Sequence, residues 1–270
     1  MNEFSGIVSQ IHKSSKMIED VVKSIETTLL VKESDFGRDA VSEVATFYET
    51  LERQRQSRID TLVSKYKSIG PLLMKVEEIV SGTSTGASPQ LSTYYLFWER
   101  RIFNAITQMI LASMTTFQAL LNVTTPDITI DARMRRKPLC KIRAAMNGKD
   151  IILTPALADV YKYISKAVKN IIESAKSFVR WMHGTCQETE PQLAKEDEEP
   201  IVFSFFTDVS ASPNIIKMML SLNEAIHKVF KVSTRYVDGW KRYEIKYELC
   251  ALTRFIGNWA NVVITEAFSA

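Results

Sequence analysis

The residues Ser81 to Ser88, with the sequence SGTSTGAS, have the small, hydroxylated composition of a loop that binds phosphate. A nucleotide-binding P-loop has the pattern G-x-x-x-x-G-K-[ST], because its lysine must reach the phosphates that the backbone N–H groups surround. Gly82 and Gly86 are separated by three residues instead of four, and Ala87 occupies the position of the required lysine. The pattern therefore indicates a structural connector between two helices, in which the glycines permit the chain to reverse.

Other residue types that perform chemistry are present in the wrong numbers or spacings. His183 and Cys186 have the spacing of one helical face, but a structural zinc site needs four ligands and no second pair lies nearby. No Ser-His-Asp, Cys-His or paired-carboxylate arrangement is indicated, and Glu77 and Glu78 are expected on a solvated helix face. The sequence predicts no catalytic, cofactor-binding or metal-binding residues, and therefore no enzymatic activity for this segment.

The three cysteines, Cys140, Cys186 and Cys250, are few, odd in number and far apart. Such cysteines are typical of reduced thiols in a cytosolic protein. The N-terminal sequence has no apolar core after a basic start, so we expect no targeting signal. No uninterrupted apolar run approaches the ~18 residues needed to span a bilayer, which predicts a soluble, intracellular protein.

A basic cluster is the main candidate for a charged contact surface. It comprises Arg133, Arg135, Arg136 and Lys137, with Lys141 and Arg143 close by. The cluster can contact an acidic protein surface, such as the acidic residues Glu196 to Glu199 or a tubulin-like polyanion, or it can form the solvated rim of a β element. Nucleic acid is not an expected partner, because the net charge is only +3 and no aromatic residues alternate with these basic ones.

Hydrophobic periodicity predicts a mainly α fold. Only nine Gly and eight Pro occur in 270 residues, which favours long regular elements. Apolar residues recur at helical spacing in several long segments: 3–30, 41–69, 72–80, 91–122, 155–182 and 212–247. We expect an elongated multi-helix bundle.

Several local features are predicted within this bundle. Gly70-Pro71 should break or kink the second helix, and Ser92 or Thr93 should help to cap the helix that follows the connector. Thr154 should cap the helix opened by Pro155, and Ser212 the helix opened by Pro213. Three arginines, Arg53, Arg55 and Arg58, are expected on a solvated face.

One β element is expected near residues 138–154. Asn147-Gly148 stands between the short runs LCKIRAAM and IILT, which is the turn chemistry of a tight hairpin. The predicted organisation is an N-terminal helical bundle (1–123), a connector with the β element (124–154) and a C-terminal helical bundle (155–270). The last range contains an acidic linker at 186–200. The sequence still has helical character at TEAFSA, which suggests that the chain continues in a larger protein.

Residues 66–106, YKSIGPLLMKVEEIVSGTSTGASPQLSTYYLFWERRIFNAI, carry a more specific signal. This stretch resembles a segment of the axonemal dynein heavy chain tail. The matching positions are Gly70, Pro71, Leu72, Leu73, Glu77, Thr85, Gly86, Ser88, Pro89, Leu91, Tyr94, Tyr95, Trp98 and Glu99. Residues 151–181 and 209–243 resemble later parts of the same tail, in the same order. Ser84 and Ala87 depart from the family pattern, which more often has Asn and a basic residue there.

The resemblance implies a non-catalytic stem segment that precedes the linker and ATPase ring of a ciliary motor. The implied partners are dynein intermediate chains, neighbouring heavy chains and, indirectly, the doublet microtubule. ATP and Mg²⁺ would belong to the ring of the parent motor, and the implied location is the axoneme of a cilium or flagellum. The alternative is a free-standing helical adaptor, or a module that binds a membrane surface or the cytoskeleton.

Two sets of residues are then predicted to hold the helices together. The resemblance implies that seven residues form a structural elbow: Gly82, Gly86, Pro89, Tyr94, Tyr95, Trp98 and Glu99. The aromatic members, Tyr94, Tyr95 and Trp98, should pack where the two helices meet. Trp98, Trp181 and Trp240 are further expected to anchor helix junctions.

Overall fold

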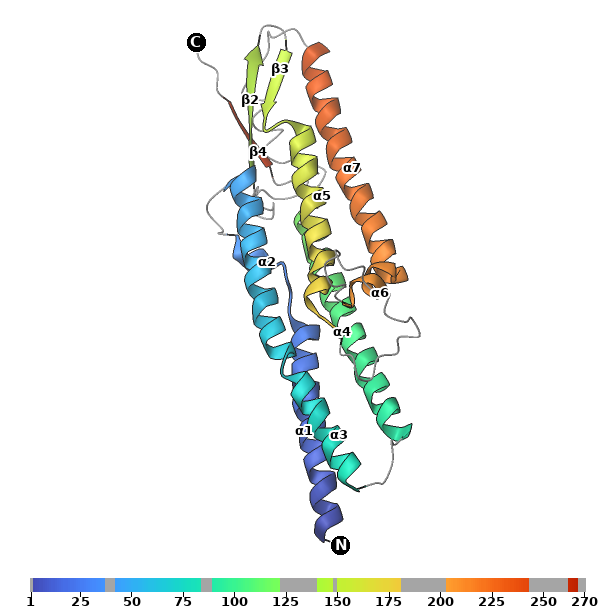
Figure 1. Ribbon diagram of the computed structural model, residues 1–270. Helices are drawn as coiled ribbons and strands as arrows, with labels where there is room; N and C mark the ends of the chain where they lie inside the picture. Colours follow the sequence, from blue (N-terminus) through green and yellow to red (C-terminus); the bar gives the residue numbers. More distant parts are fainter. Residues whose placement is uncertain are drawn as a thin grey trace, which may run out of the picture. The chain divides into compact units, whose positions relative to one another are not determined.

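The computed structural model describes residues 2–36, 42–83, 89–121, 140–147, 150–180, 203–242 and 262–266 (Figure 1). These residues are mainly helical and include a small β-sheet, which confirms the predicted mainly α, multi-helix fold with a hairpin. The contacts between residues group the chain into two compact units. Unit 1 comprises Met1–Leu30, Gln56–Leu111 and Ile172–Ile215, and unit 2 comprises Val31–Arg55, Ala112–Ile171 and Ile216–Ala270. The predicted organisation into three successive ranges stays a prediction.

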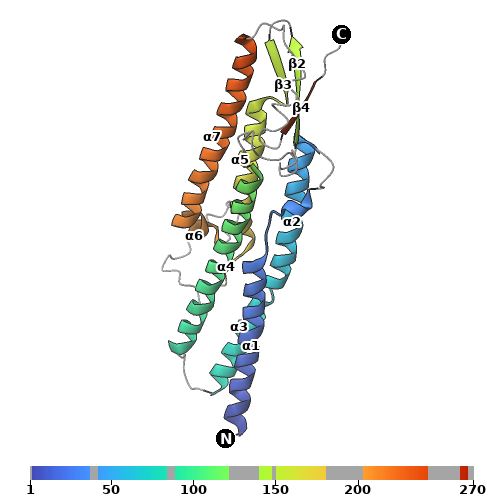
Figure 2. The same cartoon turned by 180° about the vertical axis from the view of Figure 1, so that it is seen from behind.

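In unit 1, helices α1 (Asn2–Thr27) and α3 (Ile69–Thr83) lie side by side (Figures 1 and 2). Their apolar residues recur every three or four positions, so that each helix buries one face. Ile18, Val22 and Ile25 of α1 are completely buried. The predicted helix over 3–30 is therefore confirmed, and it ends three residues earlier than expected.

The predicted break at Gly70-Pro71 is confirmed, with a small shift in position. Helix α2 (Val44–Tyr66) ends before the turn at Lys67 and Ser68, and α3 begins at Ile69. Pro71 therefore lies in the first turn of α3, where a backbone N–H has no partner within the helix and its loss costs little.

Helix α4 (Pro89–Leu121) supplies much of the buried apolar surface. Its buried residues in unit 1 include Ile102, Ile106 and Ile110, again at helical spacing. The expectation that Ser92 or Thr93 caps this helix is wrong, because the helix begins at Pro89 and both residues lie inside it. Proline is favoured at a first helical position, since its fixed φ suits the helix and the missing N–H is not needed.

The sheet belongs to unit 2 and is built around β2 (Cys140–Asn147). β3 (Asp150–Thr154) pairs with it in antiparallel orientation, from Asn147 opposite Asp150 to Arg143 opposite Thr154. This pairing confirms the hairpin predicted from Asn147-Gly148. β1 (Ser42–Glu43) and β4 (Val262–Glu266) also pair with β2, both in parallel orientation.

β4 corrects the expectation that the chain keeps its helical character to the end. Its sequence is VVITE, and its first four residues are all β-branched. Such residues lose side-chain freedom in a helix and fit the pleated surface of a sheet. The parallel partner strand β2 lies more than one hundred residues earlier in the sequence, so local periodicity gave no indication of this strand.

Helix α5 (Leu157–Glu173) corrects two predicted boundaries. Thr154 is the last residue of β3 and does not cap the helix; instead the carbonyl of Ala156 accepts the first backbone hydrogen bonds, from Asp159 and Val160. The helix also ends before the predicted Met182. A 3-10 helix (Ser174–Ser177) follows it, and Val179 then forms a β-bridge with Ser204.

The final helices are α6 (Phe206–Ala211) and α7 (Pro213–Arg242). Pro213 is the first residue of α7, as predicted, and Ser212 separates the two helices with its N–H bonded to the carbonyl of Val209. In unit 2, α7 lies beside α5 (Figures 1 and 2), and the rings of Tyr161 and His227 are tilted by 43° to each other with centroids 6.4 Å apart.

Candidate functional site

The predicted elbow lies at the ends of α3 and α4. Gly82 is exposed near the end of α3, and a Cβ atom added there would meet no other atom. Pro89 begins α4. Gly86 lies outside the described residues, as does the rest of 84–88. The role of the two glycines in reversing the chain therefore stays a prediction.

The two tyrosines of the elbow connect α4 to its neighbours in unit 1. The Tyr95 hydroxyl donates to Oε2 of Glu77 on α3 at 2.8 Å, and burial together with this hydrogen bond raises the pKa of Tyr95. The Tyr94 hydroxyl lies 2.9 Å from the hydroxyl of Ser15 on α1. Both Glu77 and Glu78 were expected on a solvated helix face. The expectation is wrong for Glu77, which is half-buried, and confirmed for Glu78, which is exposed.

Trp98 is buried beside these tyrosines, with 4% of its surface exposed. The rings of Tyr94 and Phe97 contact it edge-on, at centroid distances of 6.1 Å and 5.1 Å. Its indole N–H finds no hydrogen-bond acceptor within the described part of the chain. Trp181 lies outside the described residues, and Trp240 lies in α7; their predicted anchoring roles stay predictions.

Glu99, the last residue of the predicted elbow, belongs to a charged cluster in unit 1. Its Oε1 lies 3.3 Å from Nε of Arg180, and the two side chains are only 11% and 13% exposed. Arg180 also pairs with Asp208 of α6, and its guanidinium lies over the Phe205 ring, 4.8 Å from the centroid. We call Arg180, Glu99, Asp208 and Phe205 the Arg180 cluster.

Backbone hydrogen bonds close the chain next to this cluster. The N–H of Arg180 donates to the carbonyl of Phe203 at 2.8 Å, and the N–H of Phe205 donates to Phe178 at 3.2 Å. Together with the Val179–Ser204 bridge, these bonds pair residues 178–180 with residues 203–205. We call these two paired segments the neck. These bonds therefore hold residues 178–180 beside residues 203–205 within unit 1.

Tyr66, the last residue of α2, connects this neck to α2. Its hydroxyl donates to the carbonyl of Val179 at 2.6 Å, and its ring meets the buried Phe178 edge-on, with centroids 5.3 Å apart. Burial raises the pKa of Tyr66, and the negative charge of Glu99 raises it further. The hydroxyl therefore stays protonated and remains a donor at physiological pH.

A second ionic contact in unit 1 joins α4 to α1. The Arg101 guanidinium lies 2.7 Å from Glu19 and 3.5 Å from Glu26. The hydrogen bond to Glu19 raises the pKa of Arg101, against the opposing effect of burial. This contact is about one-third exposed and so contributes less than a buried pair of the same geometry.

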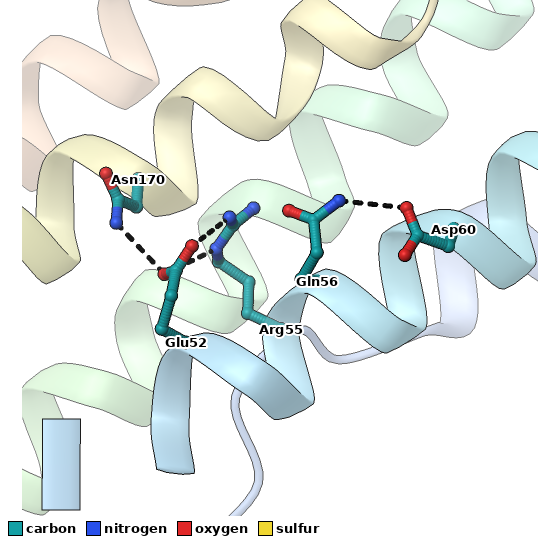
Figure 3. A network of polar contacts seen from close by, with 5 residues as sticks. All are labelled: Glu52, Arg55, Gln56, Asp60 and Asn170. Atoms are coloured by element: carbon teal, nitrogen blue, oxygen red, sulfur yellow. Dashed lines mark hydrogen bonds and ion pairs between the residues drawn. The ribbon is translucent and has the colours of Figure 1, made fainter. Parts of the chain in front are cut away.

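Unit 2 has its own polar network, between α2 and α5 (Figure 3). Arg55 donates to both carboxylate oxygens of Glu52, and Nδ2 of Asn170 donates to Oε2 of the same carboxylate at 3.0 Å. The hydrogen bond from Arg55 is the main reason that the pKa of Glu52 is lowered. Further along α2, in unit 1, Gln56 donates to Asp60 at 2.8 Å.

The expectation that Arg53, Arg55 and Arg58 lie on a solvated face is wrong for two of them. Arg53 is exposed, whereas Arg55 is 7% exposed. Arg58 is half-buried and donates to the carbonyl of Leu30 at 2.9 Å. An arginine can interrupt an apolar stripe and still be buried when acceptors lie close by, because its guanidinium carries five donors.

Cys140 is a free, buried cysteine in β2. Burial raises the pKa of its thiol to about 12, so it remains protonated and unreactive at physiological pH. Cys186 and Cys250 lie outside the described residues, as does His183.

The basic cluster Arg133, Arg135, Arg136 and Lys137 also falls outside the described residues, so its predicted contact with an acidic partner stays a prediction. Of the neighbouring residues, Arg143 in β2 is exposed and pairs with Glu43 of β1 at 2.9 Å. This pair contributes little to stability, since both side chains are exposed.

The chemistry of the described residues is that of cross-links between helices. Their polar side chains bind each other, and no group of three or more His, Cys, Asp or Glu residues among them is arranged to hold a metal ion. None of the described helices is long and apolar enough to cross a membrane. Arg180, Glu52 and Asn170 were missed by the sequence analysis, because the contacts that matter are distant in the sequence. Glu99 lies 81 positions from Arg180, and Asn170 lies 118 positions from Glu52.

Two curated proteins align with nearly the whole chain. The Dynein-1-alpha heavy chain of the flagellar inner arm I1 complex, from Chlamydomonas reinhardtii, is 42% identical over 242 residues, which are 89% of this chain and 5% of that protein. Dynein axonemal heavy chain 10, from Homo sapiens, is 33% identical over 250 residues, which are 92% of this chain and 5% of that protein. No protein-family model matches the chain. Identity at this level over nine-tenths of the chain means that it belongs to the axonemal dynein heavy chains, of whose length it spans about one-twentieth.

Proposed function

We propose that this chain is a non-catalytic stem segment of an axonemal dynein heavy chain, located in the axoneme of a cilium or flagellum. Its role is mechanical: it transmits load and offers helix surfaces for assembly. The Arg180 cluster is the observation that carries this proposal. It joins Glu99 of α4, Asp208 of α6 and the chain at Arg180 within one compact unit.

Such a cluster suits a load-bearing segment for a physical reason. Close-packed interiors deform little, and a buried charge that loses its partner is strongly destabilising. Segments distant in the sequence are therefore held together by contacts that fail only at a large cost. Three further polar contacts between helices support the proposal: Tyr95–Glu77, Arg101–Glu19 and Glu52–Asn170.

We propose three partners for this segment: dynein intermediate chains, neighbouring heavy chains and, indirectly, the doublet microtubule. They follow from the resemblance to the dynein tail and from the names of the relatives, one of which is a heavy chain of the inner arm I1 complex. ATP hydrolysis, with its Mg²⁺, is proposed for the ring of the parent motor and not for this segment.

The first test is the size of the endogenous polypeptide. An antibody against residues 66–106 should detect a very large chain on a denaturing gel of ciliated cells, and high salt should release that chain from the axoneme. A band near 30.7 kDa would contradict the proposal and favour a free-standing helical adaptor.

A second test places the segment within the motor. An antibody fragment against residues 66–106, bound to the purified motor, should mark the stem in negative-stain electron micrographs. Label on the ring would refute the stem assignment while leaving the membership of the heavy chain intact.

A further inference from the structure

Helix α7 carries a second apolar face in unit 2, which lies outside the core formed by the described residues. Leu222 and Ile226 are buried, at 1% and 5% exposure. In contrast, Ile216, Leu220 and Phe230 are 45%, 61% and 42% exposed. We call these three residues, with Met219 at 42%, the apolar stripe of α7.

The spacing places the stripe on one side of the helix. Ile216, Leu220, Asn223, His227 and Phe230 follow one another at steps of four, three, four and three. All are exposed, and the ring of His227 also contacts Tyr161 of α5. This is the spacing of a helix face that can pack against another helix, because 3.6 residues per turn bring such positions onto one side; we call these five positions the seam. From Ile216 to Phe230 the seam measures about 21 Å, at 1.5 Å per residue.

A row of mainly basic side chains lies beside the stripe. Lys217, Lys228 and Lys231 are exposed, and each follows a member of the seam by one position. They therefore form a parallel row on the adjoining side, which we call the lysine row. Glu224 is the acidic residue in that row, so the flank of the stripe is net positive.

We propose that the apolar stripe and lysine row of α7 form a docking surface for an amphipathic helix of another protein, with apolar residues at heptad spacing and an acidic flank. The apolar face would enter the seam, and its glutamates or aspartates would meet Lys217, Lys228 and Lys231. Opposite charges beside such a seam select the partner and its orientation. No step of this inference uses the dynein relatives, so it stands or falls separately from the proposed stem function.

The charges and polar residues favour this occupant over two others. A second copy of the chain would bring another lysine row into the same interface, and like charges there are unfavourable. A lipid surface would have to accept Asn223 and His227 in the middle of the apolar stripe, where acyl chains offer no hydrogen-bond partner. A partner helix can place polar side chains opposite these two residues.

The test uses two synthetic helical peptides with the same leucine heptads, one flanked by glutamate and the other by lysine. Binding to the whole 270-residue chain is measured by fluorescence anisotropy at low salt. The glutamate peptide should bind about tenfold or more tightly than the lysine peptide, as expected for complementary against like charges beside one seam.

Three variants make the test specific. Leu220→Asp should weaken binding of the glutamate peptide at least about tenfold, because it places a charge in the centre of the seam. The triple variant Lys217→Glu, Lys228→Glu and Lys231→Glu should reverse the preference toward the lysine peptide. Ile152→Asp, on β3, is the matched control: Ile152 is also exposed, at 46%, and its replacement should leave binding unchanged.

Equal binding of both peptides, or binding of neither up to millimolar concentration, would overturn the proposal. Two further measurements would also overturn it. Sedimentation of the chain as a dimer that Leu220→Asp dissociates would assign the surface to a second copy. Co-sedimentation with phosphatidylserine vesicles that Leu220→Asp abolishes would assign it to a membrane.

Discussion

The guanidinium of Arg180 lies 3.3 Å from the carboxylate of Glu99, and the two side chains are only 13% and 11% exposed. These residues come from different segments of unit 1, eighty-one positions apart. A pair so well shielded from water interacts more strongly than an exposed one, but each charge depends on the other to offset its own desolvation.

Arg180→Met should therefore destabilise the chain by about 3–5 kcal/mol, because it removes one partner of a buried ion pair. Urea unfolding followed by circular dichroism measures this change. The double variant Arg180→Met with Glu99→Gln should lose less stability than the sum of the two single variants, since the buried carboxylate that loses Arg180 is then replaced by a neutral amide.

Asp208→Asn is the matched control, because the Asp208 side chain is 50% exposed. Its effect should stay within about 1 kcal/mol, the range of solvent-exposed ion pairs. Equal losses for Asp208→Asn and Glu99→Gln would show that burial does not determine the strength of this cluster.

Trp98→Ala should cost ~3–5 kcal/mol, because it removes a large buried ring and leaves a cavity beside Tyr94. Phe97→Ala changes the adjacent residue, which is 56% exposed. It should cost no more than about 1.5 kcal/mol, because it removes an edge-on ring contact with Trp98 and little buried surface. Thermal unfolding of both variants makes the comparison. Unchanged melting behaviour of Trp98→Ala would contradict the anchoring role of this residue.

Acidification should destabilise the chain partly through Glu52, whose pKa is lowered by its hydrogen bond with Arg55. A lowered folded-state pKa contributes stability above the unfolded-state pKa of about 4.3, and this contribution is lost as the pH falls through the folded value. Glu52→Gln should therefore reduce the slope of stability against pH below about pH 5. The measurement is urea unfolding at several acidic pH values.

Glu78→Gln serves as the comparison, since Glu78 is exposed on α3. In this variant the slope of stability against pH, below about pH 5, should be the same as in the unmodified chain. If Glu52→Gln leaves the slope unchanged as well, the network of Figure 3 does not contribute to the acid response.

Excision of residues 182–201 should leave the stability of unit 1 almost unchanged. The neck is closed by bonds among residues 178–180 and 203–205, which the excision keeps. A Gly-Asn-Gly linker in their place gives a short hairpin loop of common length, and loop-closure entropy changes only slowly with length. Thermal unfolding of the shortened chain is the measurement; a large loss of stability would mean that the excised residues pack on the fold.

The parts of the fold that could be predicted are those with local signals. Ile18, Val22 and Ile25 follow a helical period and are buried, and Asn147-Gly148 marked the hairpin. The end of α5 could not be predicted in this way, because the apolar period continues through Phe178 and Val179 although these residues pair with the chain at 203–205. A long-range pairing overrode the local preference.

The candidate site shows the same division. Tyr94, Tyr95 and Trp98 were expected at a helix junction from their spacing and resemblance, and the structure places Tyr95 against Glu77 and Tyr94 against Ser15. Arg180 gave no local signal, since a single arginine after an apolar run is common on protein surfaces. Its significance depends on partners that only the folded chain brings near.

The sheet of unit 2 has a consequence for synthesis on the ribosome. β2 pairs with β4 from Cys140 to Ala144, and β4 begins only at Val262. At 5–20 residues per second, the roughly 120 residues between Ala144 and Val262 take about 6 to 24 seconds to translate. During that interval β2 has an unpaired edge, which is the kind of surface that joins strands of other nascent chains. Chaperones that act on nascent polypeptides would thus have their main opportunity to protect this protein before residue 262 emerges.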